Sequence, residues 1–187
     1  MKKSTMILLG ALAVIVIIIS MLGGSYNSLV TKQEQVDKEL ANIDVQLERR
    51  ADLIPNLVST VKGYTSHESE IIDKITSARE NLLKADSVSE KSTANNELTS
   101  ALNALMVVVE NYPDLKSNQN FIQLSDELAG TENRIATARR DYNDSVTSYN
   151  TSIKKFPTNI LAGMFGFEKK DYFEVSEGKT DVPNVEF

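Results

Sequence analysis

The sequence predicts an all-α protein, in which an N-terminal transmembrane helix is followed by an up-and-down antiparallel four-helix bundle with long helices and a C-terminal tail. Three observations predict this architecture. Residues 6–22 carry no charge, the later apolar residues recur at spacings of four and three, and only 4 prolines interrupt the chain. The predicted parts are an anchor (1–24), a helical bundle (25–156) and a tail (157–187).

The apolar run is long enough to cross a membrane. With Gly23 and Gly24 it covers 19 residues and spans about 28 Å, close to the thickness of the hydrocarbon core of a bilayer. A cleaved secretory signal is the alternative, but neither Ser20 with Leu22 nor Leu22 with Gly24 supplies the two small residues that a cleavage site needs. We therefore expect an uncleaved signal anchor.

Lysines on the two sides of the run indicate its orientation. Lys2 and Lys3 immediately precede the run, whereas Lys32 and Lys38 follow at a greater distance. Because positive charge is retained on the cytoplasmic side, we expect the N-terminus in the cytoplasm and the bundle outside it.

The first two bundle helices are expected within residues 26–85, with a break at Asp52 and Pro55. Asp52 can cap a new helix, and Pro55 fits a first turn, where its missing N–H costs no hydrogen bond. We prefer this break. A single kinked helix is the alternative, because the apolar period continues across Pro55 with the near-heptad spacing typical of coiled coils.

Two further helices complete the predicted bundle. Residues 86–92 are polar and are expected to form a turn. The third helix then runs to Pro113, and the fourth runs from about residue 117 to Phe156, ahead of Pro157. Short connections make neighbouring helices antiparallel.

The composition argues against several classes of function. A net charge of −6 does not suit nucleic-acid binding. The chain has no cysteine and a single histidine, His67, which lacks the second histidine of a zincin motif. We therefore predict no catalytic residue, no metal, no cofactor and no enzymatic activity.

Seven charged residues lie at the far end of the first helix and along the fourth, and two of them, Arg50 and Glu132, interrupt or flank the apolar seams. The seven are Arg49, Arg50, Asp52, Glu132, Arg134, Arg139 and Arg140. We favour a structural interpretation, in which Arg50 or Glu132 enters a polar layer that fixes the register between helices. A site for an anion or for a protein partner is the alternative.

Two tyrosines lie seven residues apart in the fourth helix. Tyr142 and Tyr149 are each followed by asparagine and share one helix face. Core packing with the hydroxyl at the surface is the simpler interpretation, and an interaction site is the alternative.

The tail combines apolar and basic residues. Phe165 and Phe167 precede Lys169 and Lys170. The apolar residues either cover the open end of the bundle or enter the membrane interface beside the anchor, where the lysines would meet anionic head groups.

Several sequence blocks, taken in order, resemble the LemA family. They are YNSLV (26–30), QLERRADLIPNLV (46–58), ENYPDLK (110–116), TENRIATARRDYN (131–143), FP (156–157) and PNVEF (183–187). The resemblance implies a bacterial single-pass membrane protein with an up-and-down helical bundle, and it implies no agreed activity. It also suggests a role in membrane organisation and, from neighbouring genes, a membrane metalloprotease as a partner.

The sequence thus predicts a non-catalytic, membrane-anchored interaction or scaffold protein. Its expected partners are the lipid bilayer and either further copies of the chain or another membrane protein. The alternative is a membrane-bound sensor or enzyme that binds a small anionic ligand through the arginine and carboxylate cluster.

Overall fold

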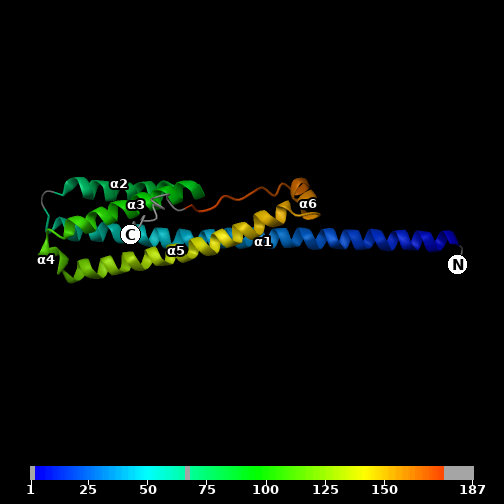
Figure 1. Ribbon diagram of the computed structural model, residues 1–187, viewed down its shortest axis with the longest axis horizontal. Coiled ribbons are helices and arrows are strands. Elements are labelled where there is room, and N and C mark those ends of the chain that lie inside the picture. The colour runs from blue at the N-terminus through cyan, green and yellow to red at the C-terminus, as the bar shows by residue number, and fades with distance from the viewer. Residues whose placement is uncertain (1–2, 66–67, 175–187) are drawn as a thin grey trace, which may run out of the picture. The chain divides into compact units, whose positions relative to one another are not determined.

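The structure is a computed structural model that describes residues 3–65 and 68–174, apart from the side chains of residues 3–8, 11 and 18. The described residues form helices and no strand, which confirms the all-α class. The helices are α1 (Lys3–Lys62), α2 (Ser69–Lys84), α3 (Val88–Val109), α4 (Pro113–Lys116), α5 (Gln119–Lys154) and α6 (Thr158–Phe165) (Figure 1).

The chain packs as two compact units. Among the described residues, the first unit consists of residues 3–39 and 143–170, and the second consists of residues 40–65, 68–142 and 171–174. The first unit therefore holds the apolar start of α1, the end of α5 and all of α6. The second holds α2, α3, α4 and the remaining parts of α1 and α5. The domain boundaries expected after residues 24 and 156 stay predictions.

The first part of α1 is apolar and exposed. Leu12, Val14, Ile17 and Ile19 each expose more than half of their surface. Among the described helices, α1 is the one long and apolar enough to cross a membrane, and little of its apolar stretch is buried.

The predicted helix break at Asp52 and Pro55 is wrong. α1 continues through Pro55 to Lys62, although proline cannot donate to the carbonyl four residues earlier. That carbonyl belongs to Ala51, and it accepts a hydrogen bond from Arg79 Nε of α2 at 2.8 Å. A side chain from a neighbouring helix thus replaces the missing backbone donor, and the continuous apolar period is preserved.

Apolar residues at four-three spacing form the core of the second unit. They come from α1, α2, α3 and α5, and each is less than one tenth exposed. The set is Ile43, Leu47, Ile54, Leu57, Val61, Ile72, Ile75, Ala78, Leu82, Leu98, Leu102, Leu105, Val109, Phe121, Leu128 and Ile135. Burial of these faces accounts for the four long helical segments, because isolated helices are marginal in water.

The connection between α2 and α3 is shorter than the predicted turn over residues 86–92. α3 begins at Val88, and Ser87 caps it. The Ser87 hydroxyl accepts a hydrogen bond from the Glu90 backbone N–H, while the Glu90 carboxylate accepts one from the Ser87 backbone N–H. This capping box starts the helix inside the polar stretch, and α2 and α3 lie side by side as a hairpin (Figure 1).

Prolines mark the other helix boundaries, as expected. Pro113 begins the short α4 after the end of α3, and Asn118 Oδ1 accepts a hydrogen bond from the Phe121 backbone N–H at the start of α5. α5 ends at Lys154, shortly before Pro157. α6 ends at Phe165, and the following Gly166, whose positive φ of 73° suits glycine, turns the chain out of the helix.

Candidate functional site

A buried arginine forms a polar layer in the core of the second unit. Arg50 of α1 is only 3% exposed. Its Nη1 donates to Asn95 Oδ1 at 2.7 Å and to Thr99 Oγ1 at 3.0 Å, both on α3. It also lies 2.5 Å from Glu132 Oε2 of α5. The layer therefore links three helices through one side chain.

Burial and the Glu132 carboxylate act on the charge of Arg50 in opposite directions. Burial lowers the pKa of Arg50, whereas the negative charge of Glu132 and its hydrogen bond raise it. Since a guanidinium stays protonated in proteins, loss of the carboxylate would leave a buried charge without its counter-ion. This geometry supports the structural interpretation of Arg50 and Glu132, and their role in fixing register stays a prediction.

A cavity of about 320 Å³ lies beside this layer. Its polar wall includes Arg50, Thr99 and Glu132, and its apolar wall includes Leu105 and Leu128. Two buried polar atoms of lining residues, Arg50 Nε and Ser125 Oγ, have no hydrogen-bond partner within the described structure. A small molecule with a polar head and a short apolar body fits such a lining.

The other predicted charged residues do not join Arg50. Arg49 and Arg134 line a shallow hollow on the same unit together with Asp126 and Glu127, so positive and negative charges are balanced there. Asp52 is exposed. Arg140 is exposed and lies 3.5 Å from its neighbour Asp141, and Arg139 is half-buried. The predicted cluster is therefore divided between the core and separate surface positions.

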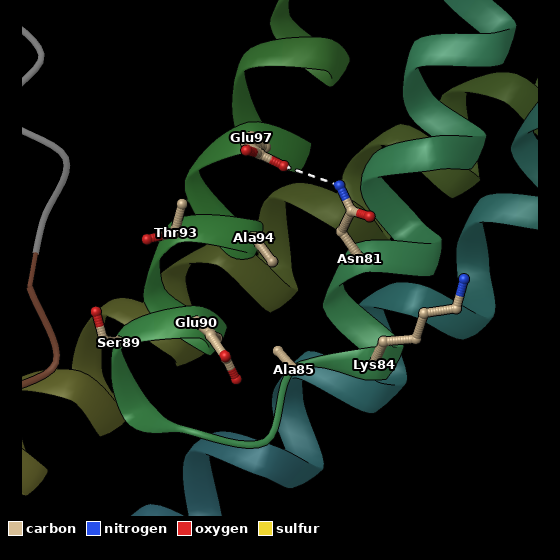
Figure 2. Close-up of a pocket in the computed structure, with 8 residues that line it drawn as sticks. All are labelled: Asn81, Lys84, Ala85, Ser89, Glu90, Thr93, Ala94 and Glu97. Atoms are coloured by element: carbon tan, nitrogen blue, oxygen red, sulfur yellow. Dashed lines mark hydrogen bonds between the residues drawn. The ribbon is translucent and has the colours of Figure 1, made fainter.

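A second open hollow lies between α2 and α3. Figure 2 shows the Asn81 amide of α2 donating to Glu97 Oε2 of α3 at 3.2 Å, with Lys84, Glu90 and Thr93 around the opening. Glu90 is already engaged by the helix cap. Of the polar residues that line this hollow, Asn81 and Glu97 thus link α2 to α3, whereas Glu90 caps α3 and Lys84 pairs with Glu80 on its own helix.

Tyr142 belongs to the core of the second unit. The side chain is 1% exposed, and its hydroxyl donates to the Asp171 carbonyl at 2.8 Å. Phe173 in the same C-terminal segment is also buried, and Ser92 donates to the Glu174 carbonyl. Phe173 is therefore part of the core, and backbone carbonyls on both sides of it are bound by side chains of α5 and α3.

Asn150, next to Tyr149 in the first unit, also binds the backbone of the C-terminal segment. Asn150 donates to the Lys170 carbonyl at 2.8 Å and accepts from the Lys170 N–H at 3.0 Å. Tyr149 is buried, and burial, followed by the charges of Asp37 and Glu168, raises its pKa. One residue of each pair, Tyr142 and Asn150, thus binds the backbone of the returning tail.

The four tail residues predicted at the membrane interface have different surroundings. Phe165 and Phe167 pack on Tyr26 of α1, with ring centroids 4.9 Å and 5.8 Å away. Phe165 stays 58% exposed, whereas Phe167 is half-buried. Lys169 is exposed, but Lys170 Nζ pairs with Asp37 at 3.0 Å.

Sequence reasoning missed several residues of these sites. Asn95 and Thr99 complete the Arg50 layer, and their polar side chains within an apolar helix face were the available signal. Phe156 was expected as the last residue of the fourth helix, but α5 ends at Lys154 and Phe156 is 81% exposed.

Among the described residues, no three His, Cys, Asp or Glu side chains come together as a metal site. His67 and the closing block at 183–187 lie outside the described residues.

Comparison with known proteins identifies the family. The LemA family model matches residues 39–187. Magnetosome protein MamQ 2 of Paramagnetospirillum magneticum is 33% identical over 175 residues, which cover 80% of this chain and 64% of that protein. MamQ of Magnetospirillum gryphiswaldense is 30% identical, with 84% and 68% covered. Protein LemA of Metamycoplasma hominis is 30% identical, with 87% and 75% covered.

The chain spans less than two thirds of the length of the Paramagnetospirillum relative. The names of these relatives state no chemical reaction. The family match nevertheless covers most of the chain, from the second half of α1 onward. The chain therefore belongs to the LemA family.

Proposed function

We propose that this protein is a non-catalytic scaffold that is anchored in a bacterial cell membrane and presents a helical surface to other proteins. The observation that carries the proposal is the continuity of α1. One unbroken helix supplies exposed apolar residues between Leu12 and Leu22, such as Val14 and Ile19, and then buried core residues such as Ile43 and Leu57. An exposed apolar stretch of this length is stable when lipid surrounds it.

The use of the polar side chains supports an interaction role over a catalytic one. Arg50 and Glu132 pair with each other, and Tyr142 and Asn150 bind backbone groups of the tail. These side chains stabilise the fold, which leaves the helix surfaces as the part available to a partner. The partner is a further copy of the chain or another membrane protein, such as a membrane metalloprotease.

Exposed apolar residues on the second unit indicate where a partner could bind. Met106 and Val107 of α3 are 46% and 71% exposed, and Leu83 of α2 is 51% exposed. Large apolar side chains at such exposure are common singly, so their use as a binding surface requires a direct test.

Site-specific photocrosslinking in intact membranes tests the scaffold. A photoreactive residue is placed at Val107 or Leu83, and at Asp52 as a polar, exposed control on the same unit. We expect reproducible protein adducts, identified by mass spectrometry, from Val107 or Leu83 and weaker ones from Asp52. Recovery of uncrosslinked monomer alone from all three positions would contradict the proposal.

The cavity beside Arg50 supports a second candidate, a sensor for a small carboxylate. Its buried cation, its apolar wall and the unpartnered Ser125 Oγ suit a carboxylate with a short alkyl chain. A ligand that binds the folded state must raise its thermal stability. We expect hexanoate to raise the melting temperature of the full chain in lipid nanodiscs.

A matched variant tests whether the cavity is responsible. Ala129 lines the cavity and is exposed on its outer side, so Ala129→Phe fills the opening and should abolish the hexanoate shift. The sensor idea fails if millimolar hexanoate leaves the melting temperature of the wild-type protein unchanged.

A further inference from the structure

An apolar stripe on α6 has no protein partner within the described structure. Ile160 and Met164 lie four residues apart on α6 and are 54% and 72% exposed, and Phe156, which precedes the helix, is 81% exposed. On a helix a spacing of four residues places side chains on one face. The opposite side of α6 is already used, because Leu161 and Ala162 are buried. The helix is therefore apolar on both sides, whereas a surface helix in water usually keeps one polar face.

The apolar stripe lies close to the part of α1 that follows the apolar run, because α6 and this part of α1 belong to the same unit. Phe165, at the end of α6, stacks on Tyr26 of α1. Tyr26 follows the last residue of the apolar run, Leu22, by four residues, or about 6 Å along the helix axis. If the run crosses a bilayer, Tyr26 lies at the interfacial level where tyrosine is enriched in membrane proteins. Figure 1 shows α6 beside α1, with the apolar part of α1 extending beyond it.

Basic residues flank the stripe. Lys154 and Lys155 precede Phe156, and Lys169 follows α6; all three are exposed. The segment 154–170 contains four lysines and a single acidic residue, Glu168, in a chain whose net charge is −6. One of the four, Lys170, is paired with Asp37. A local excess of positive charge beside exposed apolar residues is the pattern of a peripheral membrane contact.

We propose that α6 is a second membrane contact, which lies in the interface of the bilayer that holds α1. Phe156, Ile160, Met164 and Phe165 enter the boundary between head groups and acyl chains, and the lysines contact anionic head groups. This inference rests on the proposed anchoring of α1. It would fix the rotation and tilt of α1 relative to the membrane, because a single helix alone leaves both free.

The chain contains no tryptophan, so a single introduced tryptophan can report the depth of one position. We compare Met164→Trp, Val107→Trp and Val16→Trp in the full chain, reconstituted into phosphatidylcholine and phosphatidylglycerol vesicles that contain bromine-labelled acyl chains. Val107 on α3 is the matched control, because it is 71% exposed and Met164 is 72% exposed. Val16 reports the anchor itself.

We expect bromine to quench Met164→Trp at least twofold more strongly than Val107→Trp, with shallow labels more effective than deep ones at Met164. Val16→Trp should be quenched most by deep labels. Equal, weak quenching at Met164 and Val107 together with strong quenching at Val16 would overturn the inference and leave the anchor intact. Weak quenching at all three positions would contradict the anchor and, with it, the inference.

Two further variants test whether lipid or another molecule covers the apolar stripe of α6. Lys154→Gln with Lys155→Gln should reduce the quenching at Met164 in vesicles that contain phosphatidylglycerol. Because the chain has no cysteine, Met164→Cys can be tested for disulfide-linked dimers in membranes. Efficient dimer formation with weak quenching at Met164 would show a second copy on the stripe and would overturn the lipid contact.

Discussion

A single buried charge, that of Arg50, links three helices of the core. Arg50 contacts two residues of α3 and one of α5, and a shift of one residue along either helix would remove these partners. Apolar contacts are less selective, because a buried leucine tolerates many neighbours. We therefore infer that the Arg50 layer selects one helix register, as buried polar residues do in some coiled coils.

Replacement of Glu132 by leucine should destabilise the second unit. Glu132→Leu leaves the Arg50 charge without its counter-ion, at a cost of about 2 kcal/mol. This is below the ~3–5 kcal/mol of a fully buried pair, because the Glu132 side chain is 37% exposed. Urea unfolding of the full chain in detergent micelles measures the loss. The double variant with Arg50→Met should recover part of it, whereas additive losses would contradict the coupling.

The raised pKa of Tyr149 predicts that the folded protein loses stability at alkaline pH. Burial and the nearby carboxylates raise its pKa in the folded state, so the unfolded state ionises first, near pH 10. The stabilising contribution is complete below that pH and is lost as the pH rises toward the folded pKa. Tyr149→Phe should therefore lose less stability between pH 9 and pH 11 than the wild type does.

Urea unfolding at a series of pH values measures the difference. Tyr112, whose pKa is raised by its hydrogen bond to Glu68, titrates in both proteins and cancels in the comparison. Parallel pH profiles for wild type and Tyr149→Phe would show that Tyr149 does not titrate as described.

At the scale of the helices, the sequence predicted which face of each helix is buried better than it predicted the residues at which each helix begins and ends. Buried residues such as Leu98 and Leu102 follow the four-three period, which is set by helix geometry alone. The ends depend on single interactions. The capping signature of Ser87 and Glu90 is readable in the sequence and was missed within a polar stretch, whereas the Arg79 contact that allows Pro55 inside α1 joins residues 28 positions apart.

The contact between Arg79 and Ala51 should be coupled to Pro55. Arg79→Met leaves the Ala51 carbonyl without a donor and should cost about 1–2 kcal/mol of unfolding free energy. In a Pro55→Ala background the new backbone N–H can donate to the same carbonyl, so Arg79→Met should cost less there. A double-mutant cycle by urea unfolding measures this coupling, and equal costs in both backgrounds would contradict it.

The candidate sites were predictable only in part. Arg50 and Glu132 were singled out because charges interrupted apolar seams, and they do meet. Arg134 and Arg140 were grouped with them from sequence proximity, yet neighbouring residues on a helix point in different directions. The sequence left two interpretations open for the apolar residues of the tail, because a spacing of four does not distinguish an exposed helix face from a buried one.

At the scale of the whole molecule, membership of the LemA family agrees with an anchored helical protein and leaves its partner to be found. The proposed orientation, with the bundle outside the cytoplasm, follows from Lys2 and Lys3 ahead of the apolar run. Protease added to intact spheroplasts should digest the bundle. Digestion only after lysis would show the opposite orientation.

The most direct test of the account is whether the apolar part of α1 holds the protein in a membrane. Membranes from cells that produce the full chain are washed with alkaline carbonate, which removes peripheral proteins, and are then sedimented. We predict that the wild type stays in the pellet and that Val14→Lys with Ile17→Lys, which places two charges in the apolar run, is released. Release of the wild-type protein into the supernatant would contradict the anchor and the scaffold built on it.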